Sequence, residues 1–215
     1  LISAVESTGI IVDDVMASPL AGSLVILTKA QKRAGCVLAN IGAETVSIVI
    51  FENHTPISLK VFPVGGTDIT NDIALGLKVS LEEAERLKRG HGVSAVHSKR
   101  KLDEIVNARL SDIFELISAY LKKIKRDGLL PAGIILIGGG SAITGIQDNA
   151  RSLLHLPSRI AILDPGENGK VRDTSWAVAY GLCVWGFSGE DEDTGIRRAR
   201  NARNSILKWF KQFLP

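Results

Sequence analysis

Residues 35–66, GCVLANIGAETVSIVIFENHTPISLKVFPVGG, decide the fold of this chain. They contain three short runs rich in β-branched residues, at 36–40, 47–52 and 57–63, with a polar turn between each run and the next. Three strands in such tight succession predict an antiparallel meander with one face on the hydrophobic core.

Stretches with helical periodicity lie on both sides of this meander, so the chain is predicted to belong to the α/β class. Helix start and stop signals include Ser80 as a cap and the closing glycines Gly35 and Gly128. The predicted helices occupy residues 19–31, 67–77, 80–92, 101–128 and 174–187. Residues 133–156 are typical of a strand, a glycine turn and a helix in succession, and 159–163 predict another strand.

The composition is that of a folded domain. The chain has 215 residues, of which 45% are hydrophobic, enough for a substantial core. It contains no signal peptide and no apolar run of the ~18 to 20 residues that a membrane-spanning helix needs. Cys36 and Cys183 lie in apolar surroundings, which predicts buried free thiols in a reducing compartment. The chain begins without methionine, in what resembles the middle of a domain, so we expect a fragment of a longer product.

The net charge of +3 is unevenly distributed along the chain. Residues 197–215 hold six of the 26 basic residues and no acidic one, which leaves 20 basic against 23 acidic residues, a net charge of −3, in the rest. The run 190–193 just before them is wholly acidic and predicts a solvated linker. Basicity therefore belongs to the last residues, and a general nucleic-acid-binding surface on the body is not expected.

Candidate chemistry is confined to glycine turns and one charged pair. Gly138, Gly139 and Gly140 follow a predicted strand, where free N–H groups can lie against a phosphate, although such a turn can equally serve close packing of a helix on a sheet. Glu85 and Lys88, three residues apart, are by default a surface ion pair. The histidines and cysteines have neither metal-ligand spacing nor a nucleophile–base arrangement, so no metal site or His- or Cys-dependent catalysis is predicted.

Five stretches in order resemble the bacterial cell-division protein family FtsA, whose members are actin-like ATP-binding proteins: residues 35–54, 61–92, 102–117, 133–146 and the amphipathic end 200–215. The resemblance implies an actin/chaperone-like (ribonuclease H-like) second lobe with a reduced inserted subdomain and a C-terminal amphipathic helix. The expected divisions are subdomain 2A at 1–66 and 102–188, a shortened subdomain 2B at 67–101, an acidic linker at 189–199 and a membrane-targeting helix at 200–215.

The same resemblance implies an ATP site with Mg²⁺ held indirectly, through water and phosphates. The family's second phosphate loop, commonly Asp-Ile-Gly-Gly-Gly-Thr, falls on residues 40–45; GGGSA falls on its adenosine-binding turn; and the helix that approaches ribose and base carries the charged pair. The implied site residues are Asn40, Gly42, Ala43, Glu44, Thr45, Glu85, Lys88, Gly138, Gly139, Gly140 and Ser141. Asn40 stands where the family has aspartate, and Ala43 and Glu44 stand where it has glycines, so at most weak hydrolysis is expected and no catalytic residue is assigned.

When residues 200–215 are projected onto an ideal helix, their apolar side chains fall within an arc of roughly 160°, which predicts an amphipathic helix. Aromatic and aliphatic side chains on one face and lysines on the other are typical of a helix in the membrane interface. The residues predicted to bind an anionic membrane are Ile206, Leu207, Lys208, Trp209, Phe210, Lys211, Phe213 and Leu214. The alternatives are a helix that docks on its own domain and a nucleic-acid-binding arm; the clustered aromatic residues make the arm the weakest of the three.

The function implied is therefore an actin-like, ATP-binding protein that self-associates into filaments and tethers the FtsZ ring to the inner face of the cytoplasmic membrane at the division site. The family has about twenty more residues near position 93, in the subdomain that receives FtsZ, so the docking surface for FtsZ is left open. Two other interpretations remain: a weak ATPase whose turnover is the function, and a pilus-assembly-type docking module of the same fold.

Overall fold

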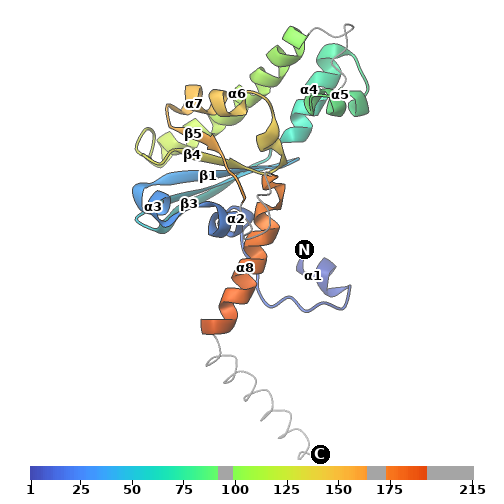
Figure 1. Cartoon of the computed structure of the whole chain (residues 1–215). Coiled ribbons are helices and arrows are strands. Elements are labelled where there is room, and N and C mark those ends of the chain that lie inside the picture. Colours follow the sequence, from blue (N-terminus) through green and yellow to red (C-terminus); the bar gives the residue numbers. More distant parts are fainter. Residues whose placement is uncertain (92–98, 164–172, 193–215) are drawn as a thin grey trace, which may run out of the picture.

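The computed structural model describes residues 1–91, 99–163 and 173–192, built around a five-stranded mixed sheet with strand order β3-β2-β1-β4-β5 (Figure 1). The first three strands form the predicted antiparallel meander, and β4 and β5 extend the sheet in parallel beyond β1. The strands are β1 Cys36–Ile41, β2 Val46–Glu52, β3 Thr55–Phe62, β4 Ile134–Ile137 and β5 Ser158–Ile160.

The central strands are buried on both faces, so the prediction of a meander with one face on the core was wrong for β1 and β2. Val37 and Ala39 belong to one hydrophobic cluster, whereas Cys36 and Leu38, on the alternate face, belong to another. The two edge strands, β3 and β5, are mostly exposed. The physical reason is visible in β2, whose continuous apolar run is typical of a strand covered by helices on both sides.

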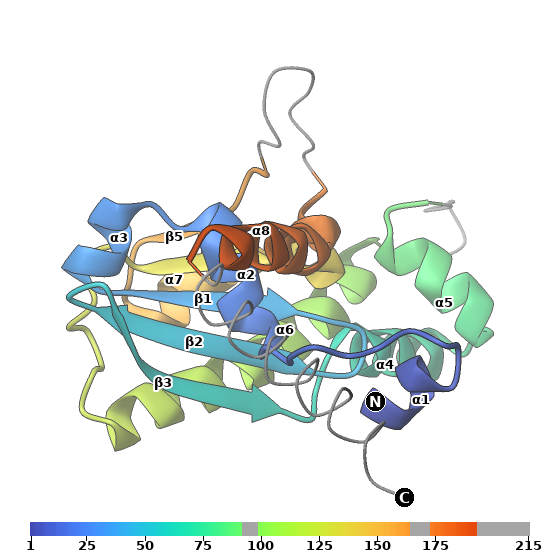
Figure 2. The same cartoon turned by 90° about the horizontal axis from the view of Figure 1, so that it is seen from below.

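Helices cover each face of the sheet (Figures 1 and 2). One face carries α4 (Gly66–Leu77), α6 (Lys99–Lys123) and α7 (Ile146–Leu154), and α5 (Leu81–Lys88) packs on α4 to one side of the sheet (Figure 2). The other carries α2 (Ser18–Ile26), on which α8 (Ala177–Glu192) packs. The short elements are α1 (Ile2–Glu6), α3 (Lys29–Ala34) and the 3₁₀ helices η1 (Gly139–Ala142) and η2 (Thr174–Trp176).

The predicted helix at 19–31 is two helices, α2 and α3. Leu27 is extended, with ψ of 127°, and Thr28 begins α3. The Thr28 hydroxyl accepts from the N–H of Gln31, and the Gln31 side chain accepts from the N–H of Thr28, which is a capping box. This local cap stops α2 and restarts the chain as a new helix.

The long helix α6 places its apolar stripe on the sheet as its periodicity predicts, burying Leu102, Val106, Leu110, Ile113, Phe114, Ile117 and Leu121. It ends at Lys123, earlier than the predicted stop at Gly128. Lys125 takes the left-handed conformation, φ 58°, and the N–H of Arg126 donates to the carbonyl of Leu121. A lysine therefore supplies the left-handed residue that glycine was expected to supply.

Helix α8 leaves one of its faces in solvent. Gly181 lies against the backbone of Ala21 in α2, where a Cβ would collide with the Ala21 carbonyl. Cys36 is fully buried as predicted, but Cys183 is exposed because it lies on the outward face of α8. The helix continues to Glu192, so the first four residues of the segment 189–199 are helical. In the described part of the chain, no helix has the length and apolar character to cross a membrane.

Candidate functional site

The carboxyl ends of β1 and β4 bring the first two predicted motifs together. Asn40 pairs in register with Ile137, so the glycine turn that follows β4 lies against the end of β1. A Cβ on Gly138, whose φ is +88°, would collide with the side-chain oxygen of Asn40, and one on Gly140 would collide with the Ile41 side chain. Close packing thus accounts for these two glycines. A Cβ on Gly139 would meet nothing within 4 Å, so this position is open to a ligand.

The β1–β2 turn is held on the N-terminus of α4. The N–H of Gly66 donates to the Gly42 carbonyl at 3.0 Å, and the N–H of Thr67 donates to the Ala43 carbonyl at 2.7 Å. The first N–H groups of α4 are therefore occupied by the turn. Within the described residues, the N–H groups of Ala43 and Glu44 have no acceptor, and both residues are exposed. The turn presents free backbone donors at the same sheet edge as Gly139.

Thr45 and Ser141 have structural contacts at this edge. The Thr45 carbonyl accepts from the N–H of Gly42 at 2.9 Å and closes the β1–β2 turn. The Ser141 hydroxyl donates to the Gly138 carbonyl at 2.7 Å and lies 2.9 Å from the Thr174 hydroxyl, and both side chains are buried. Thr174 is a residue that sequence reasoning missed, because it lies 33 residues along the chain from its partner.

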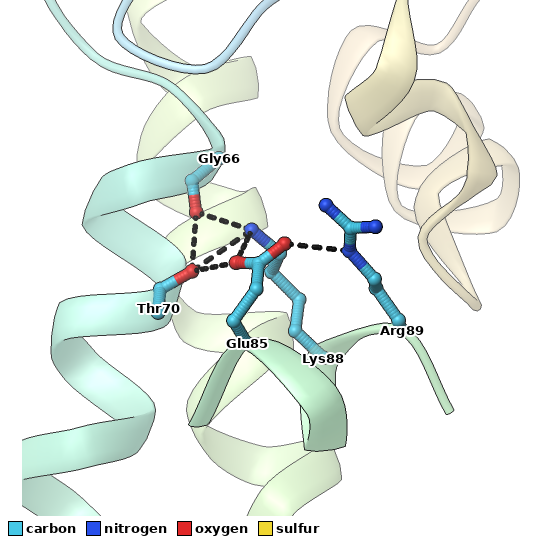
Figure 3. Close-up of polar contacts among 5 residues, drawn as sticks. All are labelled: Gly66, Thr70, Glu85, Lys88 and Arg89. Carbon is cyan, nitrogen blue, oxygen red and sulfur yellow. Dashed lines mark hydrogen bonds and ion pairs between the residues drawn. The ribbon is translucent and has the colours of Figure 1, made fainter. Parts of the chain in front are cut away.

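Lys88 lies in a partly buried cluster. The predicted ion pair between Glu85 and Lys88 is present, but it belongs to a larger network and is not an isolated surface pair. The Lys88 ammonium donates to the Gly66 carbonyl at 2.9 Å and to the Thr70 hydroxyl at 2.8 Å, and lies 2.6 Å from Oε2 of Glu85 (Figure 3). Its side chain is 12% exposed. We call Gly66, Thr70, Glu85, Lys88 and Arg89 the Lys88 cluster. All three donors of the ammonium are used within it, so α5 is fastened to the first turn of α4.

The Lys88 cluster holds Glu85 in its ionised form. Burial on its own would raise the pKa of this carboxyl, but hydrogen bonds from Lys88, Thr70 and Arg89 outweigh burial and lower the pKa to about 2. Arg89 Nε reaches the second carboxylate oxygen at 2.8 Å. Thr70 was not found from the sequence, where nothing distinguishes it from other helical threonines before α4 and α5 are packed together.

A groove of about 400 Å³ lies between the end of α5, the first turns of α6 and the loop after η1. Its floor is apolar and buried, formed by Leu87, Leu102, Val106 and Ile143. Its rim is polar, formed by Lys88, Gly90, Lys99, Asp103, Asn107, Thr144 and Gly145. An apolar floor with a few polar groups is the usual lining of a small-molecule site. Asp103, Asn107 and Thr144 were not predicted, because only the packing of α6 beside η1 brings them together.

The remaining predictions concern the membrane-binding residues, metal ions and Asn40. The predicted membrane-binding residues 206–214 lie outside the described residues. Within the described ranges, no group of three or more His, Cys, Asp or Glu side chains is arranged to hold a metal ion. Asn40 places a neutral amide oxygen beside Gly138 of the glycine turn.

Comparisons with known proteins agree on the fold and the family. A family model described as "Cell division protein FtsA" matches residues 37–181. Cell division protein FtsA of Bacillus subtilis (strain 168) is 33% identical over 203 residues, covering 85% of this chain and 45% of the relative. The chain spans about half the length of the curated relatives it matches.

Solved structures have the same actin-like fold. MreB5 of Spiroplasma citri bound to ADP superposes with a TM-score of 0.73 at 16% identity, covering 90% of this chain and 66% of that one. Ta0583, an archaeal actin homolog, gives a TM-score of 0.58 at 18% identity, covering 77% and 53%.

Proposed function

The chain belongs to the FtsA family of cell division proteins, and from this premise we propose that it forms the second lobe of an actin-like, nucleotide-binding protein that tethers the division ring to the membrane. The observation that carries the nucleotide part is the meeting of three features at one sheet edge. These are the β1–β2 turn with its free N–H groups, the open position at Gly139 and the groove of about 400 Å³ beside α6.

A bound ATP would contact these features in order, with its phosphates at the β1–β2 turn and its base in the groove. The N–H groups of Ala43 and Glu44 would hold phosphate oxygens, and the absence of a side chain at Gly139 leaves room for the nucleoside to pass toward the groove. A neighbouring structure of the same fold, MreB5 of Spiroplasma citri, is bound to ADP. Mg²⁺-ATP, when bound, would supply a polyanion that can draw two lobes together.

Asn40 fits an indirect Mg²⁺ contact and disfavours fast hydrolysis. Its amide oxygen, beside Gly138, can accept from a metal-bound water but carries no charge with which to attract or polarise one. The exposed carboxylate of Glu44 on the phosphate-facing turn further raises the electrostatic cost of holding the γ-phosphate. Nucleotide binding with little turnover is therefore the proposed behaviour, with ATP acting to stabilise a conformation.

The Lys88 cluster joins α4 to α5, which supports grouping these two helices in the proposed shortened subdomain 2B at 67–101. In this division, α4 and α5 belong to 2B, and the β1–β2 turn that contacts α4 belongs to 2A. FtsZ and further copies of the protein are the proposed partners. The docking surface for FtsZ is not assigned, because 2B is shortened relative to the family.

The membrane part of the proposal rests on the sequence of residues 200–215, with the acidic run 190–193 as a spacer. One short amphipathic helix binds an anionic surface reversibly. A filament that displays many such helices binds far more firmly without any new contact. Polymerisation would thereby hold a ring of protein on the inner face of the cytoplasmic membrane, and the whole would act at the division site.

Co-sedimentation with vesicles of phosphatidylglycerol and phosphatidylethanolamine tests whether residues 200–215 bind an anionic membrane. Trp209→Glu places a charge in the apolar face, and we expect it to reduce vesicle binding at least tenfold. Gln212→Glu adds the same charge on the polar face and is expected to retain most of the binding, which makes it the matched control. Equal binding by wild type and Trp209→Glu, or equal losses in both variants, would contradict insertion of the apolar face.

A further inference from the structure

The amino ends of the parallel strands gather basic residues from segments that are far apart in the sequence. Strands β1, β4 and β5 begin at this end of the sheet, α6 ends there, and α3 and the β2–β3 turn lie beside it (Figure 2). We call residues 28–36, 52–55, 122–133 and 155–159 the basic end. Its basic side chains, most of them exposed, are Lys29, Lys32, Arg33, Lys122, Lys123, Lys125, Arg126 and Arg159.

The fold therefore separates charge in a way that is not evident along the chain. The basic end holds eight basic and two acidic residues, a net charge of +6. The rest of residues 1–196 then holds 12 basic and 21 acidic residues, a net charge of −9. Like charges gathered on one surface create a positive potential that attracts an anionic partner.

We propose that the basic end is a second contact of this chain with the anionic membrane, in which a lipid phosphate binds between α3 and the β2–β3 turn. The inference rests on the proposed tethering to the membrane. A hollow of about 490 Å³ lies at this place, and none of its lining residues is acidic. The lining residues are Lys29, Ala30, Arg33, Ala34, Asn53 and His54.

Backbone hydrogen bonds hold the two walls of this hollow together. The N–H of Asn53 donates to the carbonyl of Arg33 at 3.2 Å, and the N–H of His54 donates to the carbonyl of Lys32 at 3.0 Å. Asn53 and His54 both take the left-handed conformation, with φ of 47° and 68°. The β2–β3 turn is thereby fixed against the end of α3, and the hollow belongs to the folded structure.

The cations of the hollow are available to a phosphate. Lys29 and Arg33 are four residues apart on α3, so they share one helix face, and both are exposed. The carboxylate beside the turn, Glu52, pairs with Arg126 at the end of α6. Two cations on one face can therefore contact the oxygens of one phosphate group.

An exposed apolar side chain favours a lipid surface over a nucleic-acid backbone. Leu129, in the loop between α6 and β4, is 64% exposed, and Lys125 and Arg126 come shortly before it. At a membrane, the leucine can enter the boundary between headgroups and acyl chains while the bases contact phosphates. A nucleic-acid backbone offers this leucine no apolar surroundings.

A second contact would give the tether an orientation. One short amphipathic helix holds a protein to a membrane without fixing which face of the body is turned toward it. A linked contact on the folded body fixes that face, and it raises the overall affinity because the second binding event is intramolecular.

Paired charge reversals in the full chain test the contact. Lys29→Glu with Arg33→Glu reverses both bases of the hollow. Arg86→Glu with Lys101→Glu makes the same change in net charge at exposed residues of α5 and of the opposite end of α6, and is the matched control. Binding to vesicles of phosphatidylglycerol and phosphatidylethanolamine is measured by co-sedimentation. Each base near an anionic surface contributes about fivefold, so we expect at least a tenfold loss for the first pair and about twofold or less for the control.

Hydrogen exchange of the wild-type chain tests the same contact without any substitution. On these vesicles, the backbone amides of residues 127–133, around Leu129, should exchange more slowly than in their absence. The loop 78–80, between α4 and α5, is the reference and should exchange at the same rate in both conditions.

The outcomes separate this inference from the proposed tether. Wild type that does not bind the vesicles would overturn both. Equal binding by the two paired variants, or unchanged exchange of residues 127–133, would overturn the second contact and leave tethering by residues 200–215 standing. Loss of self-association or of duplex DNA binding in Lys29→Glu with Arg33→Glu, with vesicle binding unchanged, would assign the basic end to another copy or to nucleic acid and would overturn the proposal as well.

Discussion

At the scale of single residues, the Lys88 cluster shows how partial burial changes the energetic contribution of a common Glu–Lys ion pair. Glu and Lys three residues apart on an exposed helix contribute a few tenths of a kcal/mol. Here the ammonium is surrounded by a carbonyl, a hydroxyl and a carboxylate, all within 2.9 Å. Removal of one partner from such an arrangement leaves the others unsatisfied and costs more than the pair itself contributes. Lys88 therefore fastens two helices together, and its ammonium is unavailable to a ligand in the groove.

We expect the pH dependence of stability to report on Glu85. Because the pKa is lowered to about 2 from an ordinary 4.5, its contribution is present above pH 4.5 and is lost as the pH falls toward 2. With 34% of the side chain exposed, solvent screening reduces the contribution to about 1–2 kcal/mol. Urea unfolding should show wild type more stable than Glu85→Gln at pH 7, with a gap that closes between pH 4.5 and 2. Glu104→Gln, on an exposed ion pair, should show a small gap throughout; a constant gap for Glu85→Gln would contradict the assignment.

At the scale of elements, the contact between the β1–β2 turn and α4 sets the geometry of the candidate phosphate site. Two hydrogen bonds join the turn to the first N–H groups of α4, and Gly65 allows the approach. The φ of Gly65 is −165°, extended backbone that any residue adopts, so glycine is required there for space alone. A Cβ at this position would collide with the carbonyl of Ala43, which is backbone and cannot rotate away.

Gly65→Ala is expected to separate the turn from the helix. We expect a loss of about 1–3 kcal/mol in the free energy of unfolding, because the strain of overpacking against backbone is not relieved by a rotamer change. Thermal and urea unfolding measure it, and NMR shift changes at Ala43 and Thr67 would localise it. Gly139→Ala is the control, since a Cβ there meets nothing within 4 Å, and it should alter stability by less than about 0.5 kcal/mol. Equal effects of the two substitutions would disprove the steric argument.

At the scale of the whole molecule, α4 and α5 share one hydrophobic cluster with the sheet and α6. Ile69, Ile73 and Leu87 pack in the same cluster as Ile48 and Leu136. Asp72 of α4 also makes a two-pronged ion pair with Arg109 of α6, at 2.6 and 3.0 Å. The proposed subdomain 2B thus has no separate core among the described residues.

One cooperative unfolding event is the expected consequence of this shared core. The backbone amides of Ile73 in α4 and Leu110 in α6 should exchange with solvent through the same global opening, with the same dependence on urea. Val5, in the short exposed helix α1, should exchange rapidly and serves as the reference for local opening. Native-state hydrogen exchange measures all three. An opening of α4 at a free energy several kcal/mol below that of α6 would show instead that 2B unfolds independently.

The sequence alone determined the elements that depend on local pattern. The meander, the amphipathic α6, the Ser80 cap of α5 and the strand–turn–helix around Gly138 all follow from periodicity and short-range hydrogen bonds. The family could also be identified, because its motifs are contiguous stretches that can be recognised, in order, without any knowledge of tertiary contacts.

Only the tertiary structure decided which side chains meet. The partners of Lys88, the exposure of Cys183 and the placement of Asn107 beside Thr144 on one groove rim depend on elements that are separated along the chain. Periodicity states which face of a helix is apolar, but not which polar group lies opposite it. That choice is made when elements pack, since buried polar atoms must find partners wherever the fold places them.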